Sequence, residues 1–216
     1  MELIENLNWR YAVKRMTGEK VPRVKVDAIL EAARLSASSA GMQPYKIIVV
    51  ADEGIKKQLQ PAAYNQPQIT EASHLLIFAA FEKITSQDID NFINLQATVK
   101  KITPESLAPF KERLVSTILP RTEEENFNWA ARQAYIALGT SLIAAANQAV
   151  VCSMQPTNPR PLRTSTQVIT SQPSLAMPLQ LLKPGLQVAM TQAPLLQVCV
   201  CVYLCMVCVC VRSEEH

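Results

Sequence analysis

A short basic segment near the start of the chain is the part of the sequence best suited to bind an anion. Arg10, Lys14 and Arg15 follow one another closely between two predicted helices. An arginine guanidinium can hold a phosphate with two parallel hydrogen bonds, and a lysine can reach the same group as a point charge. An ordinary solvated basic loop has the same composition, and composition alone favours that second interpretation.

No set of side chains with the spacing of a catalytic site accompanies this segment. The two histidines are His74, in a predicted strand, and His216. A single histidine in a strand is more often structural than a ligand. The motifs GxSxG, GxGxxG and the P-loop do not occur. Acidic residues at 88, 90 and 123–125 lie at predicted helix starts, where the helix dipole favours them. An enzyme with this sequence would therefore use a cofactor that brings its own chemistry.

The composition of the chain changes near residue 150. Residues 1–150 carry 33 of the 39 charged residues and 11 of the 12 aromatic residues, and they contain no cysteine. Residues 151–216 carry all six cysteines, seven of the 14 prolines and one aromatic residue, Tyr203. We predict a globular domain over 1–150 and an atypical Pro- and Cys-rich tail over 151–216 that is disordered or non-native.

Charge and cysteine usage limit the partners and the compartment. A net charge of +3, without a basic cluster that interleaves aromatic residues, argues against nucleic acid as a partner. A cysteine-free domain needs no oxidising compartment, and no apolar leader opens the sequence. We therefore expect a cytoplasmic protein.

Helices outnumber strands in residues 1–150. Apolar periodicity predicts helices at residues 1–8, 24–38, 53–63, 86–101, 104–119 and 123–149. Thr122 and Glu125 form a capping box at the start of the last helix, which is long and rich in small residues. Continuous apolar runs predict buried strands at 45–51 and 73–81. Many helices, few strands and no repeated βα unit indicate an α+β fold.

Four separated segments give the sequence a specific likeness. They are WRYAVKRMTGEKVP (9–22), ILEAARLSASSAGMQPYKIIVV (29–50), YNQPQITEASHLLIFAA (64–80) and NFNWAARQAYIALGTSLIAAA (126–146). In this order they resemble the FMN-dependent nitroreductase family, and the resemblance covers about residues 1–150. It implies a three-layer fold with a central sheet flanked by helices and a long central helix. It also implies a homodimer with two FMN sites at its interface.

The resemblance also implies an activity. NAD(P)H would supply hydride, and electron pairs would leave by a ping-pong mechanism to nitroaromatics, quinones or similar small-molecule acceptors. Arg10 would bind the FMN phosphate, and Tyr11 and Ala12 would line that pocket through their backbone. Lys14 would lie near the flavin pyrimidine edge, where a cation stabilises the reduced ring.

Four more residues are placed by the same resemblance. Asn65 would form a hydrogen bond with the pyrimidine edge of the flavin, and Gln68 would lie nearby. Ser38 and Ser39 would reach the flavin of the other subunit. No catalytic side chain and no metal ligand is predicted.

The resemblance stops after Val150. The family pattern continues with an acidic–Gly pair whose backbone donates to flavin N5, then a last strand and a second basic pair for the phosphate. Pro156 would stand at the glycine, and proline has no N–H to donate. Nothing in 160–216 matches the basic pair. The C-terminal part of the fold is therefore predicted to be missing or replaced, and FMN binding to be weakened by about two to four decades.

The segment QVCVCVYLCMVCVCV, residues 197–211, holds five of the six cysteines. A metal site would need turn residues between its ligand pairs, and a membrane-spanning helix needs about 20 apolar residues. A translated GT dinucleotide repeat would produce this Val–Cys alternation, and we favour that interpretation. Two alternatives to an active enzyme remain: a non-enzymatic flavin-binding remnant and a tail-anchored interaction protein. We do not expect a membrane as a partner, which argues against the second alternative.

Overall fold

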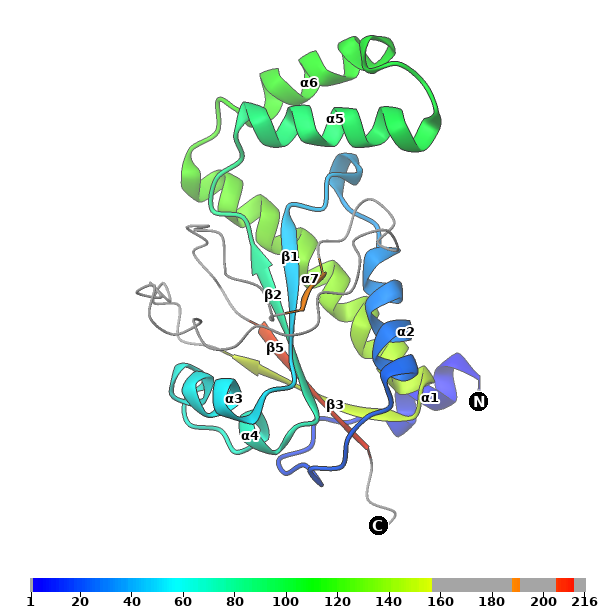
Figure 1. Ribbon diagram of the computed structural model, residues 1–216, viewed down its shortest axis with the longest axis vertical. Helices are drawn as coiled ribbons and strands as arrows, with labels where there is room; N and C mark the ends of the chain where they lie inside the picture. The colour runs from blue at the N-terminus through cyan, green and yellow to red at the C-terminus, as the bar shows by residue number, and fades with distance from the viewer. Residues whose placement is uncertain (1, 157–187, 191–204, 212–216) are drawn as a thin grey trace.

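A five-stranded sheet forms the centre of the computed structural model (Figure 1), which describes residues 2–156, 188–190 and 205–211. The strands follow the spatial order β3-β5-β2-β1-β4. Their bounds are β1 Tyr45–Val50, β2 His74–Ala80, β3 Val150–Pro156, β4 Val188–Met190 and β5 Cys205–Val211. β1 pairs antiparallel with β2, β2 and β3 pair antiparallel with β5, and β4 lies parallel to β1.

The helices account for most of the remaining described chain. The α-helices are α1 Leu3–Trp9, α2 Arg23–Arg34, α3 Glu53–Leu59, α4 Gln68–Glu71, α5 Ser86–Lys100, α6 Ala108–Ile118 and α7 Glu123–Asn147. Three short 3-10 helices are η1 Ser39–Gly41, η2 Gln60–Ala63 and η3 Pro104–Leu107. In the described residues, no helix is long and apolar enough to span a membrane.

Side chains of β2 alternate between the two faces of the sheet, as the pleat requires. Leu76, Phe78 and Ala80 belong to the main core with α2 and α7. Leu75 and Ile77 face the smaller core under α3, η2 and α4. Helices therefore cover both faces, and the prediction of an α+β fold with a central sheet between helical layers is confirmed.

The long helix α7 lies against the sheet with a face of small side chains. Ala130, Ala134, Ala137 and Ala145 are buried in the main core, where their size lets α2 and the strands approach closely. The predicted capping box is confirmed: the Glu125 amide donates to Thr122 Oγ1 at 3.2 Å, and the Thr122 amide donates to Glu125 Oε2 at 2.8 Å.

Several predicted bounds change in the structure. The predicted helix over 53–63 is divided into α3 and η2, with Pro61 in the first turn of η2. The predicted helix over 24–38 ends at Arg34, before the turn that leads to η1. The sequence did not predict α4, and it did not predict strands beyond residue 150.

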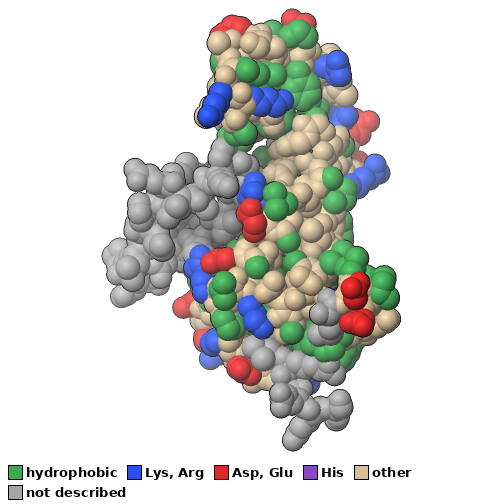
Figure 2. Space-filling model, turned by 90° about the vertical axis from the view of Figure 1, so that its right-hand side faces the viewer, with side chains coloured by type: hydrophobic (Ala, Val, Ile, Leu, Met, Phe, Trp, Pro, Cys, Tyr) green, Lys and Arg blue, Asp and Glu red, His purple; other side chains and the backbone are tan. Residues whose placement is uncertain are grey.

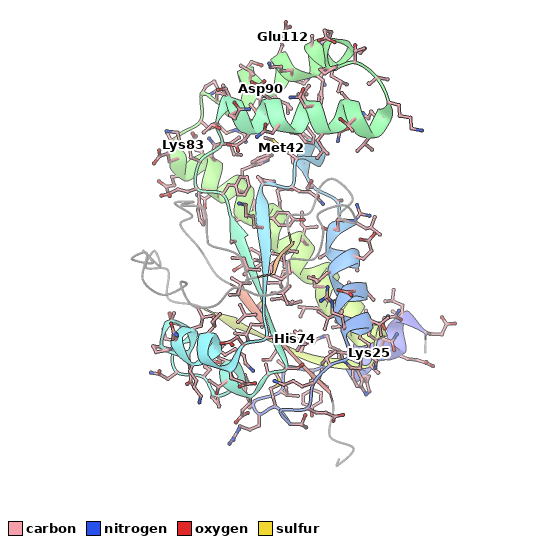
Figure 3. All side chains as sticks on the ribbon, viewed as in Figure 1. Lys25, Met42, His74, Lys83, Asp90 and Glu112 are labelled. Carbon is pink, nitrogen blue, oxygen red and sulfur yellow. The ribbon has the colours of Figure 1, made fainter. Side chains whose placement is uncertain are left out.

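The helical pair α5–α6 has a hydrophobic cluster of its own, beside the main body of the molecule (Figure 1). Ile89 and Phe92 of α5 pack with Leu114 and Ile118 of α6. Met42, which follows η1, packs against this cluster and lies beneath α5 in Figure 3. The turn after α2 is thereby fixed to the α5–α6 pair.

The repeat-like segment 197–211 contributes to the sheet. Cys205–Val211 form β5, which lies between β2 and β3, and Val209 is buried in the main core. Residues 197–204 lie outside the described residues, so the metal, membrane and repeat-DNA interpretations of the whole segment stay predictions. The predicted division of the chain at residue 150 also stays a prediction; β3 begins at that point.

Candidate functional site

The basic connector, residues 10–17, runs from the end of α1 without regular structure and is held by α4. The Met16 amide donates to Glu71 Oε2 at 2.9 Å, and Arg15 Nε donates to Glu71 Oε1 at 2.8 Å. Gln68 Nε2 donates to the Val13 carbonyl at 3.4 Å. The hydrogen bond from Arg15 is the main reason why the pKa of Glu71 lies below its usual range. Three contacts from one helical turn therefore position the connector.

The two other cations of the connector stay available. Within the described part of the chain, neither Arg10 nor Lys14 forms an ion pair, whereas Arg15 pairs with Glu71. Arg10 is half-buried, and Tyr11, Ala12 and Lys14 are exposed. Burial raises the pKa of the Cys152 thiol to about 11, and the positive charge of Arg10 opposes this shift. Arg10 therefore lies close to β3, at the side of the sheet.

Gln68 lies beside the connector at the start of α4, and Asn65 lies in the loop that precedes this helix. Tyr64 and Asn65 have left-handed backbone conformations, with φ of 55° and 56°, and Asn65 is exposed. Gln68 is buried, and its Oε1 atom accepts no hydrogen bond from the described residues. An unsatisfied buried acceptor is unfavourable by about 1–3 kcal/mol. It is an atom that a donor on a bound molecule could satisfy.

Ser38 and Ser39 lie apart from the other six predicted site residues. The connector precedes α2 and the two serines follow it, and a 12-residue helix is about 18 Å long. In Figure 1 the connector passes below the sheet, whereas η1 lies near α5 at the upper end. The structure therefore brings the connector, which holds Arg10, Tyr11, Ala12 and Lys14, together with Gln68, and Asn65 lies three residues before Gln68 in the chain. It does not bring the serines to them within one chain.

Two residues around the predicted site were missed from the sequence. Glu71 holds the connector through Arg15 and Met16. In the sequence, only its negative charge suggested that it could pair with a basic segment. Gln133 of α7 accepts a hydrogen bond from the Ser39 amide at 2.8 Å. A single glutamine in an alanine-rich helix gives no signal of that contact.

His74 has a structural role, as its isolated position predicted. Its Nδ1 atom lies 2.8 Å from Ser73 Oγ, and that oxygen accepts a hydrogen bond from the Val21 amide at 2.7 Å. The Ser73 hydroxyl can therefore donate to a neutral imidazole. Burial, and then the charges of Lys20, Lys56 and Arg23, lower the pKa of His74 below its usual value.

We predict that His74 makes the protein less stable in mild acid. Because its pKa is lower in the folded state than in the unfolded state, its contribution to stability is complete above about pH 6.5. That contribution is lost as the pH falls through the folded-state pKa. The free energy of unfolding in urea should differ less between pH 7.5 and pH 5.5 in His74→Asn than in wild type. The asparagine side-chain oxygen can still accept a hydrogen bond from Ser73. An equal difference in both proteins would contradict this prediction.

Comparison with known proteins identifies the family. A sequence model described as Nitroreductase family matches residues 7–163, which is more than half of the chain. The chain belongs to the nitroreductase family. This match confirms the family that the four sequence segments predicted, and it extends past residue 150 into the segment after β3.

Relatives of known name agree with the family. The major NAD(P)H-flavin oxidoreductase of Aliivibrio fischeri is 33% identical over 147 residues, which are 65% of this chain and 67% of that protein. A Staphylococcus saprophyticus protein with NAD(P)H nitroreductase in its name is 29% identical over 150 residues. That match covers 67% of this chain and 68% of the relative.

Solved structures of the family share the fold. A nitroreductase family protein of Streptococcus pneumoniae matches with a TM-score of 0.68 at 16% identity, over 100% of this chain and 92% of that one. The NfrA1 nitroreductase of B. subtilis matches with a TM-score of 0.60 at 18% identity, over 99% and 67% of the two chains. At such identities the likeness shows the fold alone, and it confirms the predicted nitroreductase-like fold.

Proposed function

We propose that this nitroreductase family member is an oxidoreductase that binds FMN, oxidises NAD(P)H and reduces small acceptors such as nitroaromatics or quinones. Family membership and the relative named as an NAD(P)H-flavin oxidoreductase support NAD(P)H-dependent oxidoreductase activity. One observation supports placing the flavin at the connector. Arg10 and Lys14 have no carboxylate partner there among the described residues. The cytoplasm stays the predicted location.

The residues of the connector fit the two ends of a flavin mononucleotide. Arg10 supplies a forked cation for the phosphate, and the backbone of Tyr11 and Ala12 continues that surface. Lys14 places a positive charge at the ring edge, where reduction adds negative charge. The buried Gln68 Oε1 supplies an acceptor that is still unsatisfied in the described structure. When bound, a flavin would supply two-electron redox chemistry between NAD(P)H and the second substrate.

We propose that the active form is a homodimer. Ser38 and Ser39 follow α2 whereas the connector precedes it, and the family resemblance assigns these serines to the flavin of the other subunit. Adjacent helices also expose apolar side chains: Leu3, Ile4 and Leu7 on α1, and Ile136 and Ile143 on α7. Asn6 and Asn147 join these helices through a 2.9 Å hydrogen bond. On the face of the molecule drawn in Figure 2, exposed hydrophobic side chains are interspersed with single charged side chains.

We predict that Ile143→Lys weakens the dimer. Ile143 is 44% exposed in the single chain, and a lysine there would bring a charge into an apolar contact. The dimer dissociation constant should rise by about tenfold or more. Analytical ultracentrifugation measures this change, and Val99→Lys, at an exposed apolar position of α5, is the matched control. A variant that dimerises like the control would place the interface elsewhere.

The activity is tested in two steps on the purified chain. Titration with FMN, followed by visible absorption and fluorescence, measures flavin binding. NADH or NADPH oxidation is then measured with a nitroaromatic or a quinone as acceptor. We expect weak FMN binding, because Pro156 has no N–H and the second basic pair is absent from the sequence. Bound flavin without turnover would reduce the proposal to a flavin-binding remnant, and a lack of any binding would overturn it.

A further inference from the structure

The loop between α2 and β1 has an unusual backbone. Ala40, Gly41 and Gln43 all have positive φ, at 56°, 71° and 46°. Glycine adopts this conformation readily, but alanine and glutamine rarely do. A loop with two such residues keeps its shape only where surrounding contacts hold it. Ser38 and Ser39 are part of this loop.

Side-chain hydrogen bonds hold the loop at three points. Gln43 Nε2 donates to the Arg34 carbonyl at 2.8 Å, which closes the loop onto the end of α2. The Gln43 amide donates to Ser38 Oγ at 3.2 Å. The Ser39 amide donates to Gln133 Oε1 at 2.8 Å. Of these three contacts, the last joins the loop to α7, which is far away in the sequence.

The Gln133 side chain uses both ends of its amide. Its Oε1 atom accepts from Ser39, and its Nε2 atom donates to the Trp129 carbonyl at 3.3 Å. The backbone partners determine this orientation, because an amide N–H can only donate and a carbonyl can only accept. Gln133 is 7% exposed, so these bonds have little competition from water. A leucine would lose both bonds, and an ionised glutamate would keep the first and lose the second.

We propose that Gln133 is a positioning residue, which holds Ser38 and Ser39 where they reach the flavin bound by a second copy of the chain. The inference rests on the proposed function. Gln133 acts through the hydrogen bond that its Oε1 atom accepts from the Ser39 amide. Met42 supports the same loop from the other side, through its packing against α5 and α6 (Figure 3).

The test compares Gln133→Leu with Ser141→Ala. Ser141 is also buried in α7, and its hydroxyl donates to the Ala137 carbonyl at 2.9 Å, away from the loop. Hydrogen exchange of the flavin-free chain, followed over peptides that contain residues 38–43, should accelerate in Gln133→Leu and not in Ser141→Ala. The FMN dissociation constant of Gln133→Leu should rise by about three- to tenfold, the loss expected for one or two hydrogen bonds.

Gln133→Glu separates positioning from a general effect on folding. A protonated glutamic acid can accept from Ser39 and donate to Trp129, whereas the carboxylate can only accept. The ratio of the FMN dissociation constants of Gln133→Glu and wild type should therefore fall toward one as the pH is lowered from 8 to about 5. A ratio that does not change with pH would contradict the role of the amide.

The outcomes distinguish this inference from the proposed function. If wild type binds FMN and Gln133→Leu binds it equally well, the inference is wrong and the proposed function stands. If wild type binds no FMN, both are wrong, because no flavin remains for the loop to reach. If exchange over 38–43 is unchanged in Gln133→Leu, Gln133 does not hold the loop, whatever the chain binds.

Discussion

Replacing Lys56 by methionine is expected to lower the free energy of unfolding by about 2–4 kcal/mol. The Lys56 side chain is 1% exposed. Its three N–H donors have three acceptors: the Ala72 carbonyl at 2.6 Å, the Thr70 carbonyl at 3.3 Å and Glu53 Oε1 at 3.0 Å. Methionine fills a similar volume without donating, so it leaves the Ala72 carbonyl buried and unsatisfied.

The neighbouring residue provides the control for this change. Lys57 is exposed, and Lys57→Met should change the free energy of unfolding by less than about 0.5 kcal/mol. Urea denaturation at neutral pH measures both values. Glu53 also contacts Lys20 at 2.7 Å, and neither substitution removes that partner. Equal stability of the two variants would mean that Lys56 is not required to satisfy the carbonyls around α4.

Lys56 also matters for the candidate site. The carbonyls that it satisfies belong to the end of α4 and the residue after it, and α4 holds the connector through Gln68 and Glu71. We therefore expect Lys56→Met to weaken FMN binding as well, although Lys56 lies in none of the predicted flavin contacts.

Replacing Arg10 by alanine is expected to weaken FMN binding by about a hundredfold, which would make it undetectable in a chain that binds FMN weakly. Charge-assisted bonds to phosphate are among the stronger hydrogen bonds, and a guanidinium makes two at once. Arg10→Lys keeps the charge but loses the fork, so it should bind with intermediate affinity. Flavin fluorescence titration measures all three proteins.

The control for Arg10 is Arg113→Ala. Arg113 is exposed on α6, away from the connector, and its loss changes the net charge equally. If Arg113→Ala weakens binding as much as Arg10→Ala does, the effect comes from total charge and not from a phosphate contact. Wild-type affinity in Arg10→Ala would remove Arg10 from the site.

Features that local sequence determines were predicted well. β1 and β2 are continuous apolar runs, and the start of α7 is determined by the capping box of Thr122 and Glu125. Cations are visible in any sequence, so the anion-binding potential of Arg10 and Lys14 could be recognised before the structure. The resemblance to the nitroreductase family supplied the roles of the other predicted residues, which composition alone did not distinguish.

Features that depend on distant contacts were not predicted. Gln133 matters because the Ser39 amide comes within 2.8 Å of it, and the two lie 94 positions apart. Lys56 was not recognised as buried, because a lysine in a short polar helix usually faces solvent. β5 was missed for another reason. Alternation of valine and cysteine is what a dinucleotide repeat encodes, but it also fits a strand with two buried faces.

The spatial order of the strands differs from the order in which a ribosome makes them. β5 lies between β2 and β3, yet Cys205 comes 125 positions after Ala80 and 49 after Pro156. While residues 157–204 are being translated, β2 and β3 have unpaired edges that invite pairing with other chains. A nascent chain therefore carries an open sheet throughout that interval, and we expect chaperones that bind exposed strands to associate with it until β5 emerges.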